Sequence, residues 1–239
     1  MRNGASALIA SSAITGAAAA SMAWAVRGRS STVFGPSVWR GRPGRQEIAL
    51  TFDDGPSPST PQILEILASY GVSATFFQCG ENVLRVPELS RATSIAGHEI
   101  GNHSYSHPNF AFERPSLIED EFRRAQEAIG EVTSIAPALM RPPYGVRWFG
   151  FRRMQRRLGL LGIMWSVIGR DWKLPAAAIA HRVVSHMEDG GIICLHDGRG
   201  TRANPDISAT IEAVRKIIPA LLAKGYHFVT VSELLWPTT

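Results

Sequence analysis

Residues 47–78 carry the pattern that decides the fold. They read EIALTFDDGPSPSTPQILEILASYGVSATFFQ. The apolar run 48–52 is typical of a buried strand, and the amphipathic stretch after it begins at Thr60-Pro61 and ends at Gly71, which are ordinary helix start and stop signals. A second β-prone run follows at 74–78. Strand, helix and strand in this order indicate a parallel pair joined by a crossover helix.

The same alternation continues to the end of the chain. Amphipathic stretches separate short apolar runs, which indicates a parallel sheet covered by helices. At this length, a (β/α) barrel of about seven or eight units is the natural closure, and an open doubly wound sheet is the alternative. The further predicted strands are 99–101, 138–140, 163–167, 192–195 and 228–231.

Composition points to one globular domain. The chain has 239 residues, of which 45% are hydrophobic, and a net charge of +5. Arginines are densest at 147–157, but no RNA- or DNA-binding motif accompanies them. We interpret this run as a solvated helix face and expect no nucleic-acid partner. Cys79 and Cys194 lie in apolar runs and predict two buried thiols rather than a thiolate zinc site.

An alanine-rich apolar run, about residues 5–26, follows Met1-Arg2-Asn3. This is the pattern of a secretory signal, and the run is also long enough for an uncleaved membrane anchor. A marginal helix of a cytoplasmic protein is the alternative. We predict that residues 1–29 direct export to the cell envelope or anchor the chain in a membrane through 5–26. Residues 30–46 would then be a linker and 47–239 the functional domain, so a chain that begins near Ser30 is expected to remain soluble and functional.

Ionisable side chains follow five of the predicted strands at their C-terminal ends. Parallel α/β folds place their active sites at this edge of the sheet. A single such residue is ordinary in a surface loop, whereas five strands in phase predict one shared site. The residues are Asp53 and Asp54 after the first strand, His103 and His107 after the third, Arg141 and Tyr144 after the fourth, Asp171 and Trp172 after the fifth, and His196 and Asp197 after the sixth.

Two histidines and an aspartate pair predict a metal centre. His103 and His107 share one face if their segment forms a helical turn. With one carboxylate of Asp53-Asp54 they make a ligand set that leaves positions for water and substrate. Adjacent aspartates at a strand end point in different directions, so one can bind the metal while the other faces the substrate. Zn²⁺ is the first candidate, and Co²⁺, Ni²⁺, Mn²⁺ and Fe²⁺ suit the same ligands.

Five short motifs occur in order along the chain. They are Thr51-Phe-Asp-Asp-Gly-Pro56, His103-Ser-Tyr-Ser-His107, Arg141-Pro-Pro-Tyr144, Asp171-Trp172 and Leu195-His-Asp197. Together they resemble the polysaccharide deacetylases with a NodB-homology domain, carbohydrate esterase family 4, over residues 47–235. The resemblance implies a distorted (β/α) barrel, often counted at seven strands, one divalent cation, and removal of N-acetyl groups from polysaccharide or oligosaccharide as acetate.

The resemblance also implies a role for each motif residue. Its metal ligands correspond to Asp54, His103 and His107, and its catalytic base corresponds to Asp53, which Arg141 pairs with and orients. The remaining positions are His196 as general acid, Asp171 as the carboxylate that holds it, the Tyr144 backbone N–H as an oxyanion donor, and Trp172 and Leu195 as walls of the pocket for the acetyl methyl group.

The sequence departs from the family pattern at Ile168, where an aspartate is frequent, and at Cys194, where a leucine is common. Both positions bear on the substrate pocket rather than on the reaction class. An O-acetyl esterase or a small-molecule amidase on the same scaffold is the first alternative, and a carbohydrate-binding relic without catalysis is the second. The sequence does not choose between peptidoglycan, chitooligosaccharide and other acetylated glycans as the substrate. We expect the protein to be a monomer.

Overall fold

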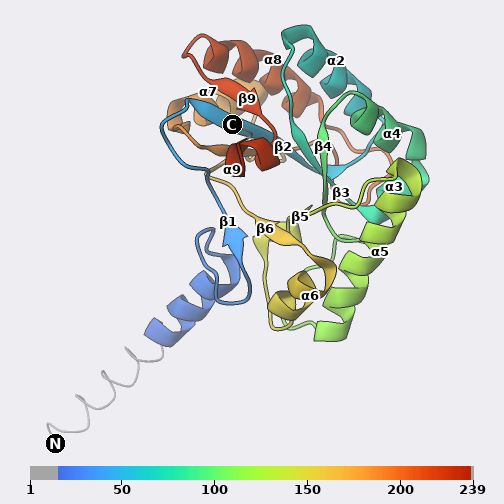
Figure 1. Ribbon diagram of the computed structural model, residues 1–239. Helices are drawn as coiled ribbons and strands as arrows, with labels where there is room; N and C mark the ends of the chain where they lie inside the picture. Colours follow the sequence, from blue (N-terminus) through green and yellow to red (C-terminus); the bar gives the residue numbers. More distant parts are fainter. Residues whose placement is uncertain (1–15, 238–239) are drawn as a thin grey trace, which may run out of the picture.

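The structure, a computed structural model, describes residues 16–237. Its centre is one sheet in which all paired strands are parallel (Figure 1). The strands are β1 (Ser37–Val38), β2 (Glu47–Gly55), β3 (Thr75–Gln78), β4 (Glu99–Asn102), β5 (Leu139–Met140), β6 (Leu161–Ile163), β7 (Val167–Ile168), β8 (Ile192–His196) and β9 (His227–Val229).

The sheet forms an incomplete barrel. The strand order is β1-β6-β5-β4-β3-β2-β8-β7, and β9 pairs with the start of β2. Within residues 16–237, the two ends of this row, β1 and β7, do not pair with each other, so the barrel is open between them. The predicted parallel α/β fold is thus confirmed, but nine strands replace the predicted seven. Predicted strand 163–167 divides into β6 and β7 because residues 164–166 cross the break in the sheet, and β1 is too short to show a pattern.

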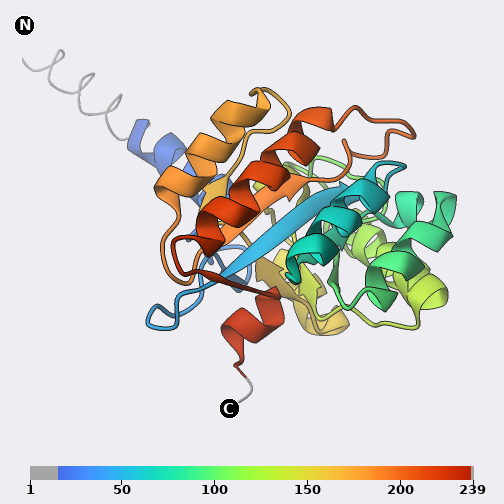
Figure 2. The same cartoon turned by 90° about the horizontal axis from the view of Figure 1, so that it is seen from above.

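Helices cover the outside of the strands (Figures 1 and 2). In the largest hydrophobic core cluster of the described residues, side chains of β2, β3 and β8 pack against α2, α7 and α8. Helix α2 begins with Pro61 in its first turn and ends at Gly71, whose φ of 62° only glycine adopts without cost. The helices are α2 (Thr60–Tyr70), α3 (Gly80–Arg85), α4 (Pro87–Ile95), α5 (Pro115–Thr133), α6 (Phe151–Leu158), α7 (Ala176–His186), α8 (Ser208–Leu222) and α9 (Val231–Leu235), with a 3₁₀ turn at Pro143–Gly145.

Alternation along β2 separates the core from the site. Leu50 and Phe52 point toward the helices, where Phe52 stacks on Phe76 with ring centroids 5.0 Å apart. Because successive side chains of a strand point to opposite faces, Thr51 and Asp53 point into the barrel. The strand therefore buries its apolar half against the helices and delivers its polar half to the interior.

The N-terminal stretch is joined to the domain at its end. Residues 16–27 are helical and extend away from the sheet (Figures 1 and 2). Ala25 is buried in the cluster formed with α5 and α6, and β1 lies within the segment predicted as a linker, 30–46. None of the helices in residues 16–237 combines the length and apolarity that a membrane span requires. Most of the predicted export segment, residues 1–15, lies outside the described residues.

Candidate active site

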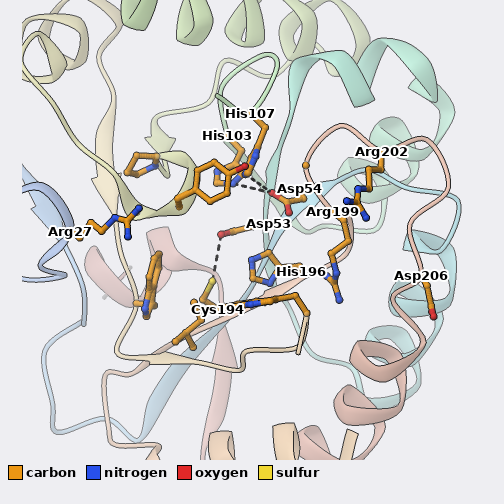
Figure 3. Close-up of a pocket in the computed structure, with 17 residues that line it drawn as sticks. Arg27, Asp53, Asp54, His103, His107, Cys194, His196, Arg199, Arg202 and Asp206 are labelled. Atoms are coloured by element: carbon orange, nitrogen blue, oxygen red, sulfur yellow. Dashed lines mark hydrogen bonds and ion pairs between the residues drawn. The ribbon is translucent and has the colours of Figure 1, made fainter. Parts of the chain in front are cut away.

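Most of the residues predicted to share a site line one cleft at the C-terminal ends of the strands (Figure 3). Arg141, Asp171 and Asp197 are not part of this lining and are buried. The cleft has a volume of about 760 Å³, toward the upper end of the range of small-molecule sites. Its lining comprises Arg27, Asp53, Asp54, His103, His107, Pro142, Tyr144, Gly145, Trp165, Ile168, Trp172, Cys194, His196, Arg199, Gly200, Arg202 and Asp206.

Asp54, His103 and His107 converge on one point. Oδ1 of Asp54 lies 3.2 Å from Nε2 of His103 and 3.0 Å from Nε2 of His107. The potential ligand atoms of the three residues all lie within 4.8 Å of one another. Asp54 reaches this point because the ladder between β2 and β3 shifts register after Asp53, and the backbone of Asp54 takes a positive φ of 72°. The bulge turns Asp54 away from the direction in which Asp53 points.

Hydrogen bonding of His103 indicates that this point suits a cation. Its Nδ1 lies 2.8 Å from the carbonyl oxygen of Arg141, which can only accept, so Nδ1 carries the proton. In the neutral ring, Nε2 then presents a lone pair to the Asp54 carboxylate. Asp54 Oδ1 is buried and has no hydrogen-bond donor among residues 16–237. A lone pair and a buried carboxylate oxygen this close fit a divalent cation between them.

The charge of Asp54 is favoured although the side chain is buried. Burial by itself raises the pKa of a carboxyl, but when the His103 and His107 rings instead donate hydrogen bonds from Nε2, these interactions outweigh burial and hold the pKa of Asp54 well below its usual range. The ligand oxygen is therefore anionic at neutral pH.

A loop, rather than the helical turn considered from the sequence, brings His103 and His107 together. Ser104 and His107 have positive φ angles of 65° and 60°, and the two imidazole centroids lie 5.1 Å apart. Glu121 of α5 holds this loop, because its carboxylate accepts hydrogen bonds from the backbone N–H groups of Tyr105 and Ser106 and from the Ser106 hydroxyl. Sequence reasoning missed Glu121, whose only signal is an acidic residue on the buried face of α5.

Asp53 is paired with Arg141 beside the cation site. Nη1 of Arg141 lies 2.6 Å from Oδ1 of Asp53, and the arginine is fully buried. The same guanidinium donates to Thr51 Oγ1 and to the carbonyl oxygens of Ile163 and Met164, and it stacks on the Phe77 ring at 4.2 Å. The second oxygen, Oδ2, lies 3.5 Å from Cys194 Sγ and is otherwise turned to the cleft.

Asp171 and His196 form the other titratable pair. Asp171 Oδ1 lies 2.8 Å from His196 Nδ1, and Oδ2 accepts from the His196 backbone N–H and from Thr210 Oγ1. Burial alone would lower the pKa of His196, but the charge and hydrogen bond of Asp171 raise it to about 9. Since Nδ1 faces Asp171, the imidazolium presents Nε2 to the cleft.

Comparison with known proteins decides the family. The family profile for polysaccharide deacetylases matches residues 40–163. The chain belongs to the polysaccharide deacetylase family. A peptidoglycan-N-acetylglucosamine deacetylase of Bacillus cereus is 37% identical over 202 residues, covering 83% of this chain and 92% of that protein. A chitooligosaccharide deacetylase of Bradyrhizobium sp. is 35% identical over 200 residues, covering 80% and 91%.

Solved structures of the family share the fold. The peptidoglycan N-acetylglucosamine deacetylase Bc1960 superposes with a TM-score of 0.79 at 32% identity, over 84% of this chain and 94% of that one. A carbohydrate esterase family 4 pseudoenzyme of Bacillus anthracis, BA3943, superposes at 0.76 with 28% identity, over 84% and 70%. With its named relatives, this deacetylase is a hydrolase that acts on carbon–nitrogen bonds.

Of the remaining predicted residues of the deacetylase, Tyr144 and Trp172 lie at the cleft and Leu195 does not. Tyr144 stands at the cleft with a positive φ of 56° and its ring edge-on to His107. Trp172 lines the cleft, half exposed, with its ring edge-on to His196 at 5.3 Å. Leu195 lies in the core that faces the helices, so the neighbouring Cys194 is the residue that lines the cleft.

Four residues in or beside the site of the deacetylase had no role in the sequence-based prediction. Arg199 lies 3.6 Å from Asp171 Oδ2 and donates to the Asp171 carbonyl, which makes it a further partner of Asp171. Burial raises the pKa of Asp197 to about 7, and its Oδ2 accepts from Thr60 Oγ1 beneath the Asp-Asp-Gly-Pro turn. Arg27 and Arg202 line the cleft from outside every motif. The placement of these four residues could not be inferred from local patterns, because each one meets segments that are distant in the sequence.

Proposed function

We propose that this chain is a metal-dependent deacetylase that releases acetate from N-acetylated glycans. The observation that carries the proposal is the convergence of Asp54, His103 and His107 beside a separately paired carboxylate, Asp53, with His196 in the same cleft. A single divalent cation fits the three ligands, Zn²⁺ first among Zn²⁺, Co²⁺, Ni²⁺, Mn²⁺ and Fe²⁺. When bound, the cation supplies Lewis-acid polarisation of the acetyl carbonyl and a lower pKa for the attacking water.

Asp53 is the general base in this proposal. Arg141 occupies one of its oxygens, which fixes the orientation of the carboxylate and leaves the other oxygen to accept a proton from water. As that proton moves to Asp53, the water oxygen bonds to the acetyl carbon. The Tyr144 backbone N–H is the proposed donor to the oxyanion that develops on the acetyl oxygen.

His196 is the general acid. The leaving amine is a poor leaving group until it gains a proton, and an imidazolium held by Asp171 can supply one at neutral pH. The products are acetate and a free amino sugar. Trp172 and Cys194 line the cleft and are the side chains proposed to enclose the acetyl methyl group. Leu195 points to the other face of β8, into the core.

Relatives named for peptidoglycan N-acetylglucosamine and chitooligosaccharide support an N-acetylated glycan as the substrate class, and with it action at the cell envelope. We keep the export or anchoring role of residues 1–29 as part of this proposal, with Ala25 to Gly28 staying attached to the domain, because Ala25 is buried in it and Arg147 binds the Val26 and Gly28 carbonyls. One structural relative is named as a pseudoenzyme, so a chain with this fold can lack catalysis, as the alternative of a carbohydrate-binding relic requires. A binding relic has no need of both a paired base and a paired acid, and this chain carries the two pairs intact.

The test is acetate release by the full chain from N-acetylchitooligosaccharide, peptidoglycan fragments and O-acetylated xylan, with chelator and with Zn²⁺ added back. We expect release from an N-acetylated substrate, its loss in chelator and its return with metal. Release from O-acetylated xylan alone would identify an esterase. No release from any substrate by protein shown to hold one metal ion per chain would favour the binding relic.

A further inference from the structure

Two arginines that no motif contains stand on opposite sides of the cleft. Figure 3 shows Arg27 on one side and Arg202 on the other, with Asp53, Asp54 and His196 between them. Both side chains are exposed, and within residues 16–237 neither guanidinium has a hydrogen-bond or ion-pair partner. Two exposed cations that flank a substrate cleft, each without a partner in the described part of the chain, suit an extended ligand with negative charges on either side of the reacting group.

Arg27 is held in place although it belongs to the N-terminal stretch. The Val26 carbonyl accepts the backbone N–H of Arg147 at 3.1 Å, and the buried Arg147 guanidinium donates to the carbonyl oxygens of Gly28 and Ser31. Ala25 is buried on the other side of Arg27. The backbone on both sides of Arg27 is thus fixed to the domain, and its side chain is left to face the cleft.

Arg202 is carried by the loop that follows β8. The loop is fixed where Asn82 Nδ2 donates to the Gly200 carbonyl at 2.9 Å. The nearby Arg199 is not equivalent, because its guanidinium is engaged by Asp171. Asp206, the acidic residue on this side, accepts the backbone N–H of Ser208 at the start of α8.

The carboxylates of the proposed catalytic site already have partners within it. Asp53 is paired with Arg141, Asp171 with His196, and Asp54 belongs to the cation site. Arg27 and Arg202 are therefore in excess of what the proposed chemistry needs. A guanidinium binds a carboxylate through two parallel hydrogen bonds, which gives direction as well as charge.

We propose that Arg27 and Arg202 are specificity-determining residues that bind carboxylates on the sugars flanking the N-acetyl group to be cleaved. This inference rests on the proposed function and narrows its substrate to glycans that carry carboxylates. The cleft volume of about 760 Å³ leaves room for more than the reacting sugar.

The test compares two oligosaccharides that differ only in charge. One is a peptidoglycan glycan fragment with free lactyl carboxylates, and the other is the same fragment with those carboxylates converted to amides. The measured quantity is the ratio of kcat/KM for the two. We expect the unaltered enzyme to prefer the carboxylate form and Arg27→Gln and Arg202→Gln each to lower the ratio roughly 3- to 10-fold, mainly through KM. The preference should also weaken as salt concentration rises.

Arg153→Gln is the matched control, since it removes the same charge from an exposed position of α6 outside the cleft. It should leave the ratio as it is, and Arg27→Lys and Arg202→Lys should retain part of the preference. A ratio near one for the unaltered enzyme, or one that neither glutamine variant changes, would overturn the inference. If no fragment is turned over, the proposed function fails, and calorimetric binding of the deacetylated carboxylate and amide fragments still tests the two arginines.

Discussion

Nη1 of Arg141 lies 2.6 Å from Oδ1 of Asp53, and both side chains are buried. The guanidinium is satisfied on all sides by Thr51, by two backbone carbonyls and by the Phe77 ring. Such a buried pair is costly to split, because removing one partner leaves the other charge buried and uncompensated. Stability and orientation of the proposed base therefore depend on the same contact.

Replacing Arg141 by methionine should lower both the stability of the protein and its catalytic rate. The free energy of unfolding should fall by about 3–5 kcal/mol, the usual cost of an orphaned buried charge, and kcat should fall as Asp53 loses its orientation. Urea denaturation and acetate release measure the two effects. Arg123→Met, at an exposed arginine paired with Asp120 and Glu127, is the control and should cost within about 1 kcal/mol. Equal costs for both variants would remove the special role of the buried pair.

Asp53→Asn separates the two adjacent aspartates. The proposed base has its oxygens directed to Arg141 and Cys194 rather than to the cation site, so the variant should keep one metal ion per chain. The rate should fall by roughly two to four orders of magnitude, the range typical of a lost general base. Elemental analysis and acetate release check this. Loss of the metal together with the activity would show that Asp53 is a ligand.

Removing a proposed metal ligand should abolish metal binding, unlike the replacement of Asp53. His103→Ala leaves two protein ligands, too few to hold a divalent ion at ordinary concentrations, so bound metal and activity should disappear together. His186→Ala, an exposed histidine at the end of α7, should change neither. Full activity of the His103 variant in chelator-treated buffer would contradict the metal site.

The Asp171–His196 pair predicts the alkaline limb of the pH profile. A general acid must be protonated, and Asp171 raises the pKa of His196 to about 9, so the rate should fall as pH rises through about 9. Asp171→Asn removes the charge that favours imidazolium, and the limb should therefore move to lower pH. Log kcat/KM measured from pH 6 to 10.5 locates the alkaline limb in the unaltered enzyme and in each variant. A limb that stays in place in both Asp171→Asn and His196→Gln would assign the proton to another group.

Sequence patterns could predict what lies on one strand or one motif. The apolar runs located β2, β3, β4, β5 and β8, and most of the polar residues at their ends do line one cleft. They could not tell which side of β8 faces inward. Register settles this: Thr51 pairs with Cys194 and Phe52 with Leu195, and Phe52 faces the helices. Which face of a strand points inward becomes known only when its pairing register with the neighbouring strands is known.

Contacts between distant segments were beyond the sequence for the same reason. Glu121 shapes the loop of His103 and His107 from the middle of α5, and Arg199 holds Asp171 from the next strand's loop. The boundary of the domain is a third case. Apolar composition marks residues 5–26 as one run, but the structure joins its last residues to the domain through Arg147.

That join changes the expectation for a shortened chain. A chain that begins at Ser30 lacks the Val26 and Gly28 carbonyls, so the Arg147 backbone N–H and one end of its buried guanidinium lose their acceptors. Each buried donor left unsatisfied costs about 1–3 kcal/mol, so this chain should be clearly less stable than one that begins at Met22, which keeps Ala25, Val26 and Gly28. Urea denaturation of the two chains at equal metal loading gives the difference. Identical midpoints and slopes would show that the domain begins after Ser30, as the sequence alone predicts.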